Sequence, residues 1–163
     1  MRATPPPATP TPGADLVDTW RIHVRVQRYL LEGIAPAAFD VPAPGKGRGF
    51  VAMAAHLHNV RLMWLDAAAP DLRAGLVKLD AAALDRAGLL SALEASGAAI
   101  AQLIERALET GRVKGFKPHP AAFLGYLISH EAYHHGEIGI ELSRIGHPLE
   151  KKTAFGIWEW GVR

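Results

Sequence analysis

The sequence predicts an all-α fold, a four-helix bundle with a short C-terminal capping segment. Three observations support this class. Apolar residues recur at helical spacing, Pro and Gly clusters separate the periodic stretches, and neither an alternating strand pattern nor a 20–50-residue repeat is present. A chain of 163 residues with 49% hydrophobic residues is enough for one domain with its own core.

Four long helices follow in order along the chain. The first is expected over about 15–32, ended by Gly33 before Pro36, and a loop rich in Pro and Gly covers 40–49. The second is expected over about 50–68, the third over about 85–110 with Gly111 behind it, and the fourth from after Pro118 and Pro120 to about 145. The remaining segment, 151–163, carries Phe155, Trp158 and Trp160, which we expect to cap an open end of the bundle.

Composition excludes several kinds of site. The chain has no Cys, so disulfides, thiolate zinc sites, iron–sulfur clusters and a cysteine nucleophile are ruled out, and any reacting thiol must come from outside. The formal charge is only +2 and the Lys and Arg residues are scattered, so we expect no nucleic-acid partner. No apolar run reaches the roughly 20 residues needed to span a bilayer, so we expect no membrane partner.

The chain divides into two unequal parts. Residues 1–12 contain five prolines and lack the apolar core of a secretory signal, so we expect a disordered Pro-rich tail and a cytoplasmic protein. Residues 13–163 then form a single helical domain.

Two histidines stand on the apolar side of the fourth helix. His130 and His134 fall within the stripe, roughly 120° wide, that carries its apolar residues. The i, i+4 spacing stacks both rings on one side of the helix, which suits two coordination positions of one divalent ion. The alternative is a pair of core histidines that are hydrogen-bonded to other groups.

The second helix offers a third ligand, either His56 or His58. On a helical wheel His56 shares its side with Met53, Val60 and Met63, whereas His58 falls roughly 200° away. We therefore expect His56 to point into the core. His56, His130 and His134 would form a three-histidine metal site that leaves positions open for water or substrate.

Residues 130–134, His-Glu-Ala-Tyr-His, also match H-E-x-x-H, the zinc metalloprotease signature. In that interpretation Glu131 is the catalytic base, and Glu150 or Glu159 supplies a further ligand. The pattern does not extend to the longer metzincin form, and no strand is predicted that would hold an extended peptide.

The same residues resemble the DinB-like family of metal-binding four-helix bundles, which includes damage-inducible proteins and thiol-dependent S-transferases. The resemblance covers most of 15–163. It rests on Ala55-His56-Leu57 with Trp64-Leu65 downstream, and on the run from His130 to Ile138. The family pattern, roughly H-x-x-x-H-R-G-Q-I, matches at His130, His134, Gly136 and Ile138. The chain departs from it at His135, where Arg is usual, and at Glu137, where Gln is usual.

The resemblance implies a Zn(II) or Ni(II) ion held by His56, His130 and His134 in a homodimer. It also implies an enzyme that transfers a small-molecule thiol, such as bacillithiol or mycothiol, to an electrophile. Two alternatives remain open at this point. One is a metal-dependent hydrolase with Glu131 as base, and the other is a metal-binding stress-response protein without catalytic activity.

Overall fold

The computed structural model describes residues 13–42 and 47–163. Its main elements are four long helices, α1 (Ala14–Glu32), α2 (Phe50–Ala68), α3 (Arg86–Thr110) and α4 (Pro120–Arg144), followed by a short α5 (Lys151–Gly156). Short 3₁₀ turns lie at Pro36–Asp40, Pro70–Arg73, Ala81–Ala83 and Trp160–Val162. The described part of the chain contains no β-strand, so the expectation of an all-α fold is confirmed. The expected tail, 1–12, lies outside the described residues.

The long helices begin and end within a residue or two of the positions that the sequence predicts. The side chain of Asp85 accepts a hydrogen bond from Gly88 N (2.7 Å) at the start of α3, and Gly111 ends that helix in the left-handed region with φ 70°. At the start of α4, His119 Nδ1 accepts from Ala122 N (3.1 Å), and Pro120 occupies the first helical position.

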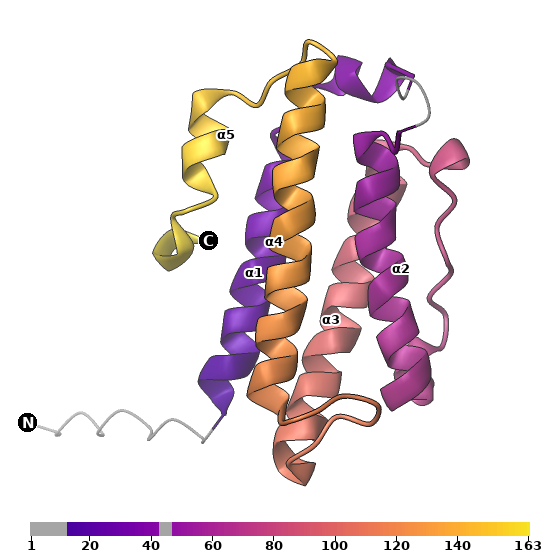
Figure 1. The fold of residues 1–163 in the computed structure, drawn as a ribbon, viewed down its shortest axis with the longest axis vertical. Coiled ribbons are helices and arrows are strands. Elements are labelled where there is room, and N and C mark those ends of the chain that lie inside the picture. Colours follow the sequence, from indigo (N-terminus) through magenta and orange to yellow (C-terminus); the bar gives the residue numbers. More distant parts are fainter. Residues whose placement is uncertain (1–12, 43–46) are drawn as a thin grey trace, which may run out of the picture.

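The long helices lie side by side, and α2 packs against both α3 and α4 (Figure 1). Their buried apolar residues form two clusters, one near each end of the helices. One cluster includes Trp20, Ile104 and Phe123, and the other includes Leu57, Leu89 and Ile138. The polar residues considered below lie between or beside these clusters, on helices that the apolar packing holds in place.

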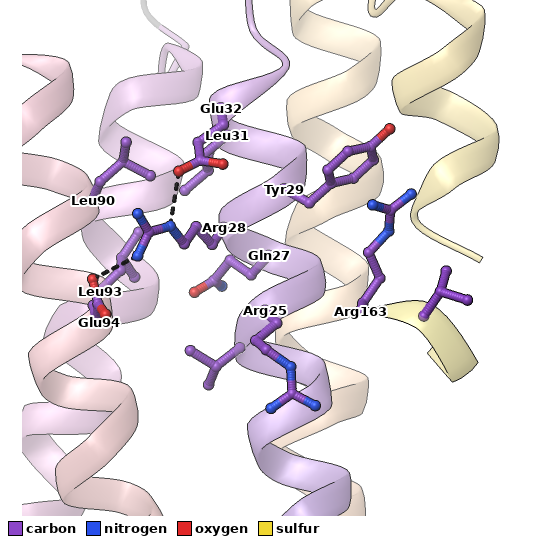
Figure 2. A pocket seen from close by; sticks show the side chains of 12 residues that line it. Arg25, Gln27, Arg28, Tyr29, Leu31, Glu32, Leu90, Leu93, Glu94 and Arg163 are labelled. Atoms are coloured by element: carbon purple, nitrogen blue, oxygen red, sulfur yellow. Dashed lines mark hydrogen bonds and ion pairs between the residues drawn. The ribbon is translucent and has the colours of Figure 1, made fainter. Parts of the chain in front are cut away.

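The C-terminal segment differs from the expectation. It runs alongside α1 and α4 instead of covering an end of the molecule (Figure 1). Arg163 lies over the ring of Tyr29 at 3.8 Å from the ring centroid (Figure 2). Tyr29 Oη donates to Lys152 O. Phe155 and Trp158 are 70% and 76% exposed, so these two rings do not close off the core as predicted. The contact is lateral because Gly156 leaves room for Tyr29, whose ring would lie within 3 Å of any Cβ there.

One helix, α3, is long and apolar enough to cross a membrane by length and composition alone. Half of the window that meets this test is buried inside the structure. A core helix that packs against other helices passes the same test, and α3 contacts α1, α2 and α4.

Candidate metal centre

Three histidines from two helices converge on one point. His56 comes from α2, and His130 and His134 lie one turn apart on α4, which packs against α2. The centroid of the His56 ring is 5.5 Å from that of His130 and 4.9 Å from that of His134, and the last two are 4.8 Å apart. Each ring offers one nitrogen, and these three nitrogens lie within 4.8 Å of one another. The structure therefore brings together all three of the predicted ligands.

The cluster fits a divalent ion. Zn–N bonds of 2.0–2.1 Å in a tetrahedral site would place ligand nitrogens about 3.4 Å apart, so small rotations of the rings suffice to close the set. His130 Nδ1 is buried without a hydrogen-bond partner, an arrangement that is costly in a plain core. All three rings are half-buried, so the cluster opens toward solvent on one side.

His134 is oriented by a carboxylate. Its Nδ1 lies 2.6 Å from Glu137 Oε2, one turn further along α4. A carboxylate can only accept from Nδ1–H, so in the neutral ring Nε2 is the nitrogen that can bind a metal. The hydrogen bond to His134 in turn lowers the pKa of Glu137. Glu137 stands where the family pattern has Gln, and here it holds a ligand ring in place.

The other two rings are biased toward the neutral form. Burial lowers the pKa of both His56 and His130, and the neighbouring His134 lowers each further by charge repulsion. A histidine must be neutral to bind a metal, so these shifts favour the ligand-competent state near pH 7.

The groove beside His56 has a volume of about 500 Å³ and carries two cationic residues. Arg48 and Lys78 line it together with Asn59 and Met63. On the other side of the cluster, Tyr126 stacks on His130 with ring centroids 6.2 Å apart, and Trp64 packs edge-on against Tyr126. The three histidines thus lie between a basic groove and an aromatic wall.

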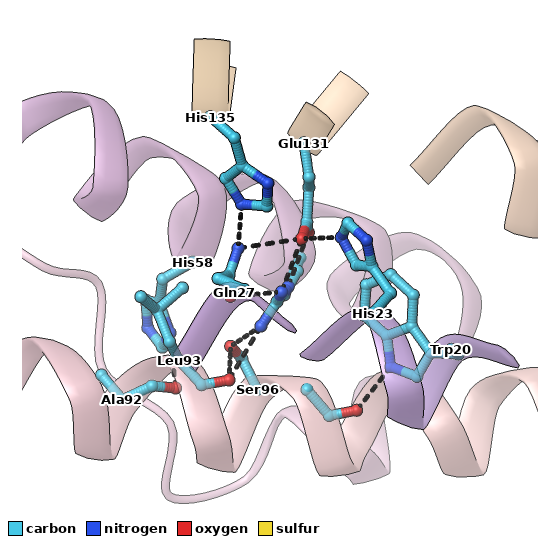
Figure 3. A network of polar contacts seen from close by, with 11 residues as sticks. Trp20, His23, Gln27, His58, Ala92, Leu93, Ser96, Glu131 and His135 are labelled. Carbon is cyan, nitrogen blue, oxygen red and sulfur yellow. Dashed lines mark hydrogen bonds and ion pairs between the residues drawn. The ribbon is translucent and has the colours of Figure 1, made fainter. Parts of the chain in front are cut away.

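Glu131 does not face the cluster in the way that the H-E-x-x-H interpretation requires. The side chain is 1% exposed, and its carboxylate accepts from Arg61 Nε (2.7 Å) and Nη2 (2.6 Å), His23 Nε2 (2.8 Å) and Gln27 Nε2 (3.1 Å) (Figure 3). The next residue along a helix points about 100° away, and here that direction leads between α1 and α2. The expected role of Glu131 as a base gives way to that of a buried counter-ion.

Arg61 is the centre of this buried network, and sequence reasoning missed it. It is fully buried and also donates to Leu93 O (2.8 Å) on α3 and Gln27 Oε1 (2.8 Å) on α1. Burial alone would raise the pKa of Glu131, but the Arg61 charge and the hydrogen bonds from His23 and Arg61 hold it far below its usual range. The sequence signal that could have identified this pair is a single charged residue on an otherwise apolar helix face, Arg61 on α2 and Glu131 on α4.

His135 joins the same network where the family pattern has Arg. Its Nε2 lies 3.0 Å from Gln27 Nε2, and its ring stacks on that of His23. Burial lowers the pKa of His135 to about 3, so the ring is neutral.

The helical wheel misjudged the burial of both histidines on α2, although His56 does join the histidine cluster. His58, expected to point outward, is 1% exposed, whereas His56 is only half-buried. His58 Nδ1 lies 3.0 Å from Ala92 O and Nε2 lies 2.9 Å from Val77 O. Burial lowers its pKa, while the hydrogen bonds to the two carbonyl oxygens act in the opposite direction. The segment between α2 and α3 covers this side of α2, which the periodicity of one helix could not indicate.

The comparisons with known proteins add no further constraint. No family model, no curated protein and no solved structure matches this chain. The description of the metal centre therefore depends on the residues and their geometry alone.

Proposed function

We propose that this protein is a divalent-metal-dependent enzyme of the DinB-like family that transfers a low-molecular-weight thiol to an electrophilic substrate. The observation that carries the proposal is the convergence of His56, His130 and His134 beside an open groove. Three protein ligands with a free position are typical of catalytic zinc sites, whereas structural sites are closed by four.

A bound Zn(II) or Ni(II) ion would supply Lewis-acid chemistry that lowers the pKa of a coordinated thiol or water toward neutrality. The chain supplies the rest. Glu137 orients the ring of His134 through Nδ1, and burial favours the neutral forms of His56 and His130. A free thiol with a pKa near 8.5 is only a few per cent ionised at pH 7. Deprotonation of the thiol is therefore the step that a bound metal would assist.

The lining of the groove supports a cosubstrate that carries a negative charge. Arg48 and Lys78 are exposed in its lining, next to His56, so an anionic group on the cosubstrate would be attracted there. The aromatic wall of Tyr126 and Trp64 offers an apolar surface for the electrophile.

The position of Glu131 favours thiol transfer over hydrolysis. A hydrolase of the H-E-x-x-H kind needs that carboxylate to accept a proton from water beside the metal. Here both of its oxygens already accept from Arg61, and one of them also accepts from His23 and Gln27. The remaining alternative to the proposed enzyme is a metal-binding protein without catalytic activity.

The test uses Co(II)-substituted protein, whose visible spectrum reports the ligands of the metal. We expect an anionic thiol such as bacillithiol or mycothiol to produce a sulfur-to-metal charge-transfer band. His130→Ala should abolish the band, and His147→Ala, which alters a histidine outside the cluster, should leave it unchanged. The proposal fails if a panel that also includes glutathione and coenzyme A leaves the spectrum unaltered while the protein hydrolyses an ester or amide unaided.

The same family resemblance supports a homodimer. Sedimentation equilibrium of the purified protein measures its mass directly. A mass of about twice 17.5 kDa supports the dimer, and a mass equal to the single chain contradicts it.

A further inference from the structure

A second cavity lies on the far side of α4 from the histidine cluster. Its volume is about 440 Å³, within the range of sites that hold small organic molecules. It lies between α1, α4 and the C-terminal segment, and its walls are mainly apolar. Side chains in these walls include Val26, Leu30, Ile128, Ile157, Trp158 and Trp160.

The cavity and the metal centre are separate sites. At 100° per residue, the α4 residues that line the cavity, such as Ala132, His135 and Gly139, lie roughly 165° on average from the direction of His130 and His134. A ligand in the cavity would therefore be separated from the metal centre by the body of the helix. None of the three metal-binding histidines lines this cavity.

Two histidines form the polar part of the cavity lining. His23 and His135 both line it, and their rings stack with centroids 5.6 Å apart. His23 Nε2 lies 2.8 Å from the carboxylate of Glu131, to which it donates, so Nδ1 is the ring nitrogen left for a ligand.

The tautomer of His135 follows from the buried network. Arg61 has only donors, so the oxygen of the Gln27 amide must face it, and the amide nitrogen faces Glu131 and His135. The Nε2 of His135 therefore accepts, and its Nδ1 carries the proton. Neither Nδ1 of His23 nor Nδ1 of His135 has a partner among the described residues, and neither is completely buried.

We propose that this cavity binds a small, uncharged, largely apolar molecule that carries one hydroxyl-type group. Such a group both donates and accepts, so it can accept from the Nδ1–H of His135 and can also pair with Nδ1 of His23. The apolar walls would contact the remainder of the ligand. The ring of Trp158 lines the cavity but is exposed, and a bound ligand would cover part of it.

The charge of the ligand follows from the surroundings. None of the described residues that line the cavity is Asp, Glu, Lys or Arg, and Arg61 and Glu131 in the adjoining network neutralise each other through two hydrogen bonds. A charged ligand would lose its hydration in an apolar cavity without gaining a counter-ion. A further hollow, about 470 Å³ between α1 and α3, is lined by charged residues: its Arg28 is paired with Glu32 and Glu94 (Figure 2).

The test compares three naphthalene derivatives of similar size by equilibrium dialysis against the full-length protein. We expect saturable one-to-one binding of 1-naphthol. We expect 1-methylnaphthalene, which lacks the hydroxyl, and 1-naphthoate, which is charged, to bind at least about tenfold more weakly. Absence of saturable 1-naphthol binding overturns the proposal. Equal binding of 1-methylnaphthalene, or tighter binding of 1-naphthoate, overturns the ligand class.

A cavity-filling variant locates the binding. Gly139 lines the cavity, and a Cβ built there meets no atom within 4 Å, so Gly139→Leu should fold normally and fill the space. The matched control is Gly125→Leu, on the same helix with equally open surroundings but outside the cavity lining. We expect Gly139→Leu alone to weaken 1-naphthol binding at least tenfold, with both variants keeping the wild-type circular dichroism spectrum. Unchanged affinity in Gly139→Leu refutes the location.

Discussion

Replacement of Glu131 by Gln separates a structural role of this residue from a catalytic one. The substitution keeps the size and one oxygen of the side chain but removes the charge that balances Arg61. Arg61 is completely buried, and both of its hydrogen bonds to Glu131 are short, 2.7 and 2.6 Å. Loss of one partner from a buried ion pair costs about 3–5 kcal/mol, and the oxygen that remains places this variant near the lower limit.

In a domain of this size each kcal/mol shifts the melting temperature by about 2–4 °C, so we expect a loss of about 6–12 °C. Differential scanning calorimetry measures it, with Glu109→Gln as the exposed control on α3. Arg61→Met combined with Glu131→Leu should recover most of the loss, because no buried charge is left unpaired. If Glu131→Gln melts within 1 °C of the wild type while catalysis disappears, Glu131 is a catalytic base and the reasoning is wrong.

The same variant has a predictable pH dependence. The pKa of Glu131 is lowered in the folded protein, so the ionised carboxylate stabilises the fold at pH values above its unfolded pKa of about 4.3. This stabilisation is lost as the pH falls below that value toward the folded pKa. The difference in melting temperature between wild type and Glu131→Gln should therefore be constant from pH 6 to 8 and shrink below about pH 4.

Three further variants test other contacts. Glu137→Gln should weaken zinc binding about 10–100-fold in a competition titration with a chromophoric chelator, because it loosens the hold on His134; unchanged affinity contradicts this role. His58→Phe should keep its full zinc content by elemental analysis but unfold at lower temperature, and loss of zinc would make His58 a ligand. Gly156→Ala should release the C-terminal segment to limited proteolysis, because the new Cβ would fall 2.5 Å from Tyr29 Oη; wild-type resistance refutes the close contact.

Local signals predicted the helices well. Pro, Gly and capping residues fix where a helix begins or ends, and these depend on a few neighbouring residues. The i, i+4 spacing of His130 and His134 is equally local, since it places both rings on one side of α4 whatever surrounds that helix.

Burial on α2 was not predictable in the same way. The helix packs against α3 and α4, and the segment that follows it folds back over the side bearing His58. A helix covered on several sides has no single apolar stripe, so a helical wheel misjudges which residues are inside. The partners of Glu131 come from α1 and α2, 70 to 108 residues away in sequence, and no local pattern specifies such pairings.

The Arg61 network also restricts how the helices can slide. Its hydrogen bonds join α1, α2, α3 and α4 through one guanidinium group, which has donors in fixed directions. Apolar side chains tolerate many relative positions of two helices, but a shift of α4 by one residue moves Glu131 about 1.5 Å along the axis and breaks bonds of 2.6–2.8 Å. The network therefore fixes the axial position of α4 relative to the other helices. That position sets where His130 and His134 meet His56.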